Sequence, residues 1–203
     1  MQKLKHIWHY YKAPIIITII LISILYSVLS DFLGICKTYP DYQIAYVGDK
    51  MLPEDTVKSI SDAIKTFGDD LNNDGDIIVK INQYTNDTSD VEYSSKIKLL
   101  ADITDCESYF FLLDNPDKFQ RDYEILEENQ IYAWKNCPVL SQLDLGNYSQ
   151  QILDKTITGD NQDLLSNLYF THRIFSSDNK NNVYDIHGCK TLWEKLTKNA
   201  VKQ

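Results

Sequence analysis

The feature that most constrains this chain is an apolar run near its N-terminus that contains no charged residue. It extends from Ala13 to Ser30 and reads A-P-I-I-I-T-I-I-L-I-S-I-L-Y-S-V-L-S. A helix of that length spans about 27 Å at about 1.5 Å per residue, close to the hydrocarbon thickness of a bilayer. Pro14 suits the first turn of such a helix. We therefore predict a transmembrane helix over residues 13–33.

Charges on the two sides of the run predict its orientation. Three lysines precede it, at positions 3, 5 and 12, and the first acidic residue of the chain, Asp31, follows it. Because basic residues stay on the cytoplasmic side, we expect residues 1–12 to form a cytoplasmic tail. Residues 34–40 are then a stalk, and residues 41–203 form an extracytoplasmic domain. The chain would be a single-pass protein of the cell membrane.

Two cleaved signals are alternatives to the anchor. Val28-Leu29-Ser30 is a tolerable cleavage site for a signal peptide, and Leu33-Gly34-Ile35-Cys36 superficially resembles a bacterial lipoprotein signal. The apolar core of a signal peptide is shorter than this run, and Ile35 is bulky where a lipoprotein signal has a small residue. The uncleaved anchor is favoured, and all three interpretations leave the domain outside the cell.

The charge of the rest of the chain limits its partners. Of the 20 Lys and Arg residues, three precede the apolar run, which leaves 17 against 29 Asp and Glu residues and a net charge of −12. Nucleic acid needs a basic footprint, and anionic lipid headgroups need one too. We therefore predict that the domain binds no nucleic acid, whereas cationic partners and Ca²⁺ are compatible with its charge.

Apolar segments alternate with amphipathic ones through the first half of the domain. Three segments are typical of strands, at 42–47, 77–83 and 109–113, and two between them show helical spacing, at 53–67 and 90–104. This order predicts an α/β fold in which a mainly parallel sheet is flanked by helices. In the second helix, Tyr93, Ile97, Leu100 and Ile103 recur at helical spacing, and we expect them to form its buried face.

The second half of the domain is less regular. Asn115-Pro116 is a helix start, with a capping residue followed by proline at the first position. Residues 131–134 and 168–175 suit strands, and Leu192 to Ala200 define a C-terminal amphipathic helix.

A ligand rim is predicted where the parallel strands end. In such sheets ligands bind beyond the carboxyl ends of the strands. The polar residues that follow the three predicted strands are Asp49, Tyr84, Asp114 and Asn115. Each also has an ordinary structural interpretation, since Asp49 suits a turn and Asp114-Asn115 suits a helix cap.

A second motif points to a cation. Residues 70–76 read D-L-N-N-D-G-D, which matches the first seven positions of a calcium-binding loop. Its ligands would be Asp70, Asn72, Asp74 and Asp76. The pattern then fails, because the twelfth position is Ile81 and not Glu. The alternative is a tight connection between a helix and a strand. Ca²⁺ is the one cofactor that the sequence suggests.

No motif in the chain assigns catalytic residues. The four cysteines are too far apart for a C-x-x-C site, at positions 36, 106, 137 and 189, so disulfides and buried free thiols both stay open. His172 or His187 could pair with Cys137 as a base and a nucleophile, but structural roles are favoured for all three. An enzyme is therefore the less favoured class of function.

Several segments together resemble a family of membrane-anchored proteins from clostridia-like Gram-positive bacteria. They are the anchor, D-L-N-N-D-G-D-I-I-V-K-I-N-Q-Y, Y-F-F-L-L-D-N-P-D-K-F-Q, W-K-N-C-P-V-L, L-D-L-G and L-W-E-K-L. The resemblance covers nearly the whole chain and implies a location at a bacterial cell surface. It carries no known activity. The order of strands and helices also resembles one lobe of extracellular solute-binding proteins, at the level of fold only.

These observations favour a non-enzymatic module that is tethered to the membrane and binds a small ligand or a partner protein outside the cell. The alternatives are a cell-surface hydrolase and an accessory subunit of a transport or secretion assembly.

Overall fold

The computed structural model of the chain describes residues 14–26, 39–85, 89–152, 154–174 and 185–201. The chain divides into two compact units, Met1–Tyr39 and Pro40–Gln203.

In the first unit, residues 14–26 form an α-helix inside the predicted transmembrane segment 13–33. The hydroxyl of Thr18 donates a hydrogen bond of 2.8 Å to the carbonyl oxygen of Pro14, one turn earlier. The remainder of the predicted segment, the tail over 1–12 and most of the stalk over 34–40 lie outside the described residues. Within the described ranges, no helix combines the length and apolar character that a membrane crossing requires.

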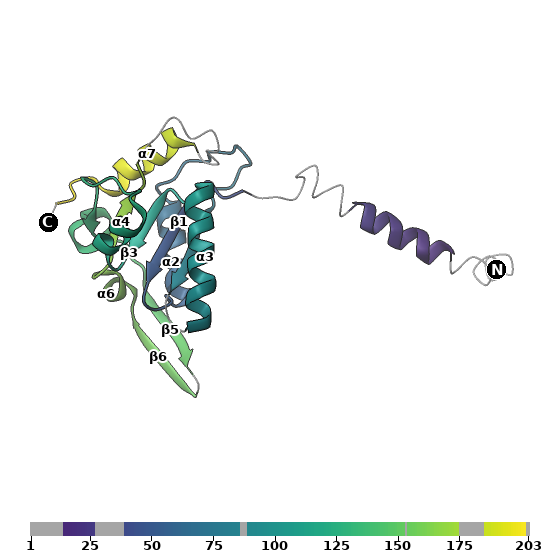
Figure 1. Cartoon of the computed structure of the whole chain (residues 1–203), viewed down its shortest axis with the longest axis horizontal. Helices are drawn as coiled ribbons and strands as arrows, with labels where there is room; N and C mark the ends of the chain where they lie inside the picture. The colour runs from purple at the N-terminus through teal and green to yellow at the C-terminus, as the bar shows by residue number, and fades with distance from the viewer. Residues whose placement is uncertain (1–13, 27–38, 86–88, 153, 175–184, 202–203) are drawn as a thin grey trace. The chain divides into compact units, whose positions relative to one another are not determined.

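The second unit is built on a five-stranded sheet in the order β2-β1-β3-β7-β4 (Figure 1). The strands are β1 (Tyr42–Gly48), β2 (Val79–Thr85), β3 (Phe110–Leu113), β4 (Tyr132–Ala133) and β7 (Tyr169–His172). β1 lies between β2 and β3 and is parallel to both. β7 is antiparallel to β3 and to β4, so the sheet is mixed. The predicted α/β class and the parallel arrangement of the first three strands are confirmed.

Helices cover both faces of this sheet. The longer ones are α2 (Glu54–Lys65), α3 (Ser89–Asp105), α4 (Pro116–Tyr123) and α7 (Ile186–Leu196). Alternate side chains of each strand point to opposite faces. Ile44 and Phe110 therefore pack with α2 and α7, together with the short segments η1 (Trp134–Asn136), α5 (Pro138–Ser141) and α6 (Asn161–Leu165). Ala45 and Phe111 pack on the other face with α3 and α4.

The predicted buried face of α3 is wrong for three of its four residues, whereas Ile103 is partly buried against the core. Tyr93, Ile97 and Leu100 are exposed by 72%, 51% and 55%, whereas Leu99 is 3% exposed. Two polar residues are buried beside Leu99, and both have hydrogen-bonding roles there. The Ser95 hydroxyl accepts a bond of 2.8 Å from the Thr85 N–H, and Asp102 accepts one of 2.8 Å from the Ser108 N–H. A prediction from apolar spacing places polar residues such as Ser95 and Asp102 on the solvent side. It therefore assigns the wrong face of α3 to the core.

A hairpin that the sequence did not predict follows α5. Its strands are β5 (Asn147–Ile152) and β6 (Lys155–Asp160), paired antiparallel and separate from the main sheet. Most of its described side chains are exposed, and in Figure 1 it projects beyond the sheet. Near its base, the Ser149 N–H donates a bond of 3.1 Å to a carboxylate oxygen of Asp55 on α2. Because the strands bury little apolar surface, they lack the alternation that indicates a strand.

The orientation of α3 can be tested with a matched pair of substitutions. Leu99→Ala should lower the free energy of unfolding by about 2–5 kcal/mol, because it leaves a cavity in the core. Ile97→Ala, two residues earlier on the exposed face, should change it by less than about 0.5 kcal/mol. Urea denaturation followed by tryptophan fluorescence measures both. A larger loss for Ile97→Ala would show that the face predicted from the sequence is the buried one.

Candidate functional site

The connections of β1 and β3 open a crevice at the carboxyl ends of these two neighbouring strands. After β1 the chain continues into α2, which packs on one face of the sheet, and after β3 it continues into α4, which packs on the other. Neighbouring parallel strands whose connections diverge in this way form a topological switch point, where α/β proteins bind ligands.

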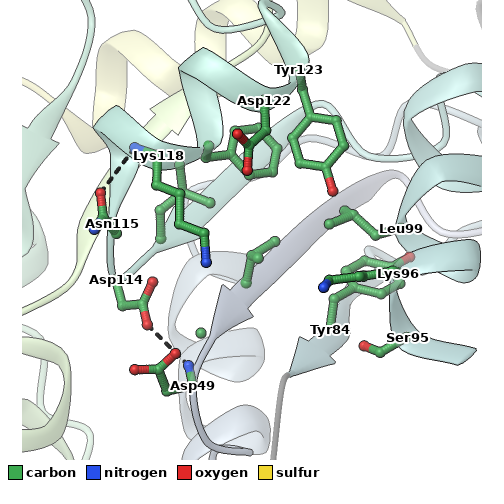
Figure 2. A pocket seen from close by; sticks show the side chains of 14 residues that line it. Asp49, Tyr84, Ser95, Lys96, Leu99, Asp114, Asn115, Lys118, Asp122 and Tyr123 are labelled. Carbon is green, nitrogen blue, oxygen red and sulfur yellow. Dashed lines mark hydrogen bonds between the residues drawn. The ribbon is translucent and has the colours of Figure 1, made fainter. Parts of the chain in front are cut away.

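A pocket of about 470 Å³ occupies this position (Figure 2). Its volume falls within the range of sites for small molecules. Its lining comes from the ends of β1, β2 and β3 and from α3 and α4: Val47, Gly48, Asp49, Tyr84, Ser95, Lys96, Leu99, Leu113, Asp114, Asn115, Lys118, Phe119, Asp122 and Tyr123. The four residues of the predicted ligand rim, Asp49, Tyr84, Asp114 and Asn115, all line this one pocket. Their role in binding stays a prediction.

The ends of β1 and β3 are tied together at the rim of the pocket. The Asp49 N–H donates a hydrogen bond of 3.0 Å to Oδ2 of Asp114, which fixes one oxygen of that carboxylate (Figure 2). Gly48 lies beside them, and a Cβ at this position would lie 2.6 Å from Cζ of Tyr46. The Tyr46 ring therefore folds back under Gly48, and its hydroxyl donates to the Lys50 carbonyl oxygen at 2.7 Å.

Asn115 begins α4, as its sequence predicts. Its side-chain oxygen accepts a bond of 2.9 Å from the Lys118 N–H, and Pro116 occupies the first turn. This cap directs the first turns of α4 along the pocket and brings Lys118 and Asp122 to its rim, four residues apart on one helix face.

Tyr84 lines the pocket, and its hydroxyl is held by a buried carboxylate. It donates a bond of 2.6 Å to Oδ2 of Asp102, which also accepts from the Ser108 hydroxyl at 2.7 Å. Burial and this hydrogen bond to a carboxylate raise the pKa of Tyr84 well above its ordinary value. The phenol therefore stays protonated, and the residue offers the pocket a fixed aromatic surface rather than a titrating group.

Burial and nearby carboxylates also keep two other tyrosines near the pocket protonated. Burial and the charges of Asp114 and Asp49 raise the pKa of Tyr46 to about 12. Burial and the charge of Asp122 raise the pKa of Tyr123, although Lys96 partly opposes this. These hydroxyls can donate or accept hydrogen bonds at neutral pH without carrying charge.

Both lysines of the pocket were missed by the sequence analysis. Lys96 comes from α3 and Lys118 from α4, and Figure 2 shows their side-chain nitrogens directed from different walls toward the same space. The prediction considered only residues that directly follow the strands. A signal for Lys118 exists in Asn115-Pro116-Asp117-Lys118, because a capped helix start at a strand end keeps its first turn at the same edge of the sheet.

The cysteines and histidines of the described chain lie outside this pocket. No disulfide joins Cys106, Cys137 and Cys189 to one another, and all three are buried, whereas Cys36 lies outside the described residues. Burial raises the pKa of the Cys137 thiol to about 11 and lowers the pKa of His172 to about 4. At neutral pH the Cys137 thiol therefore stays protonated and the His172 imidazole stays uncharged.

The loop over residues 70–76 is closed by its own side chains. Oxygens of Asp70, Asn72 and Asp74 accept hydrogen bonds of 2.9, 2.9 and 3.0 Å from the N–H groups of Gly75, Asp74 and Asp76, respectively. These bonds define a tight turn before β2, at the opposite end of the strand from the pocket. In the part of the chain that the structure describes, no group of three His, Cys, Asp or Glu residues is placed to hold a metal ion. Calcium binding here stays an untested alternative to a purely structural turn.

Comparison of the chain with models of known protein families, with curated proteins and with solved structures finds no match. The two resemblances drawn from the sequence therefore remain predictions.

The loop can be tested by removing calcium. Asp70→Ala should lower the free energy of unfolding by about 1 kcal/mol, because it removes the acceptor of the Gly75 N–H. The loss should be the same in Ca²⁺ and in chelator, measured as thermal unfolding, with the exposed Asp62→Ala on α2 as the control. A wild-type melting temperature that rises in Ca²⁺, with no rise in Asp70→Ala, would establish the metal site instead.

Proposed function

We propose that this chain is a non-enzymatic binding module, tethered to the membrane, whose outer domain holds a small polar ligand in the pocket between β1 and β3. The observation that carries the proposal is the position of the pocket. It lies where the two connections diverge, and it gathers the polar residues that follow β1 and β3 together with Tyr84 near the end of β2.

The chemistry of the lining supports binding over catalysis. The described residues around the pocket include neither histidine nor cysteine, and Ser95 already accepts the Thr85 N–H. A hydrolase of the serine or cysteine type needs a nucleophile with an adjacent base. The same pocket offers several carboxylates, two ammonium groups and aromatic surface, which is the mixture that fixes the orientation of a bound solute.

The tether is supported by the sequence. The uncharged run from Ala13 to Ser30 follows three lysines and precedes an acidic chain. This distribution favours a cytoplasmic N-terminus and an outer domain in a single-pass protein. The resemblance to surface proteins of clostridia-like bacteria supports the same location.

Labelling with a membrane-impermeant maleimide tests the orientation. In a Cys36→Ser background the buried thiols of the domain should stay unlabelled, so that added cysteines report alone. Thr156→Cys on the exposed β6 should react in intact cells, whereas Gln2→Cys should react only after lysis. Reaction of Gln2→Cys alone in intact cells would reverse the orientation.

Ligand binding can be tested by blocking the pocket. A mixture of amino acids, sugars, nucleosides and small organic acids should contain solutes that raise the melting temperature of the purified full-length chain through mass action. Asp122→Trp, at the exposed rim of the pocket, should abolish that rise because the indole fills the mouth. Asp163→Trp, exposed on α6, is the matched control. A rise that survives Asp122→Trp would place binding elsewhere.

A further inference from the structure

Two opposite charges in the pocket have no charged partner among the described residues. The carboxylate of Asp49 and the ammonium group of Lys118 both line it, and neither forms an ion pair or a side-chain hydrogen bond within the described residues. The hydrogen bonds of both residues use their backbone N–H groups instead. The charged ends of both side chains are therefore available to a ligand.

The charges are arranged on different walls. Asp49 and Asp114 follow β1 and β3 at the rim, whereas Lys118 extends from α4 and Lys96 from α3 (Figure 2). Asp114 accepts the Asp49 N–H through Oδ2, which fixes the position of the Asp114 carboxylate. A ligand in this space meets the carboxylates of Asp49 and Asp114 on one side and the two ammonium groups on others, with the Asp122 carboxylate on the same helix as Lys118.

The balance of these charges selects the kind of ligand. Three carboxylates line the pocket (Asp49, Asp114 and Asp122), against two lysines. A simple anion would lie close to carboxylates that repel it, and a simple cation would lie close to ammonium groups. A molecule that carries one charge of each sign can complement both walls. Leu99, Leu113 and Phe119 add an apolar surface for the rest of that molecule.

We infer that the ligand of this pocket is a small zwitterion, with a protonated amine and a carboxylate, of the size of an amino acid or a short peptide. The inference rests on the proposed binding function. The amine contacts Asp49 and Asp114, and the carboxylate contacts Lys118, with Lys96 adding positive potential from the opposite wall. Charge-assisted hydrogen bonds at both ends hold the molecule in one orientation.

The test uses the common α-amino acids and alanyl-alanine as probes of the purified full-length chain. Binding is measured by thermal shift and by isothermal titration calorimetry. At least one of these zwitterions should bind, and its methyl ester and its N-acetyl derivative should each bind on the order of tenfold or more weakly, because each lacks one charged end.

Substitutions separate the two ends. Lys118→Met should lower the affinity for the zwitterion on the order of tenfold but change the affinity for its methyl ester little, since the ester has no carboxylate. Asp49→Asn should also lower the affinity for the zwitterion, but it should change the affinity for the N-acetyl derivative little, since that derivative has no protonated amine. Lys98→Met and Asp62→Asn remove the same charges from exposed residues outside the pocket and serve as controls.

Four results would count against the inference. Equal binding of capped and uncapped probes, or tight binding of sugars or simple organic acids alone, would contradict a zwitterionic ligand but not the proposed binding function. Loss of affinity in the control variants equal to that in Lys118→Met would assign the effect to overall charge. Absence of any binding, by these probes and by the broader mixture of solutes, would overturn the proposed function as well.

Discussion

α2 leaves the end of β1 toward one face of the sheet, and α4 leaves the end of the neighbouring strand β3 toward the other face. This divergence decides where the domain can hold a ligand. It arises because β3 lies on the other side of β1 from β2. The chain therefore crosses one face through α2 and the other through α3, and the carboxyl ends of β1 and β3 are left without a covering connection. The pocket, its carboxylates and both of its lysines are gathered around this opening.

Buried carboxylates hold the segments that frame this arrangement. Asp102 on α3 accepts bonds from Tyr84 and from Ser108, and thereby fixes the end of β2 against the chain that enters β3. Asp41 is 4% exposed and accepts bonds of 2.8 and 2.7 Å from the N–H groups of Leu71 and Ile78. It fastens the turn over residues 70–76 to the start of β1. A buried carboxylate is stable only when it is hydrogen-bonded, so Asp41 and Asp102 each depend on these donors. The same bonds hold in place loops that have little apolar surface of their own.

The sequence predicts the parts of this fold in which apolar periodicity and capping agree. β1, β3 and α2 are long or continuously apolar, and Asn115-Pro116 starts α4 where predicted. The four residues of the predicted rim line one pocket because the strand ends of a parallel sheet lie together. Prediction failed on α3, where polar residues are buried and apolar residues are exposed. It also failed at the β5–β6 hairpin, whose strands bury little apolar surface. Lys96 was missed because its place depends on which face α3 buries, a tertiary property that spacing alone does not determine.

The most direct test of the account is the location of a bound zwitterion. Amide chemical shifts of the full-length chain, titrated with the amino acid that binds most tightly, report which residues it contacts. The account predicts the largest changes at Gly48, Asp49, Asn115, Asp117 and Lys118, with little change in the β5–β6 hairpin or in the turn over residues 70–76. Saturable changes confined to the hairpin or to that turn would contradict a ligand site between β1 and β3.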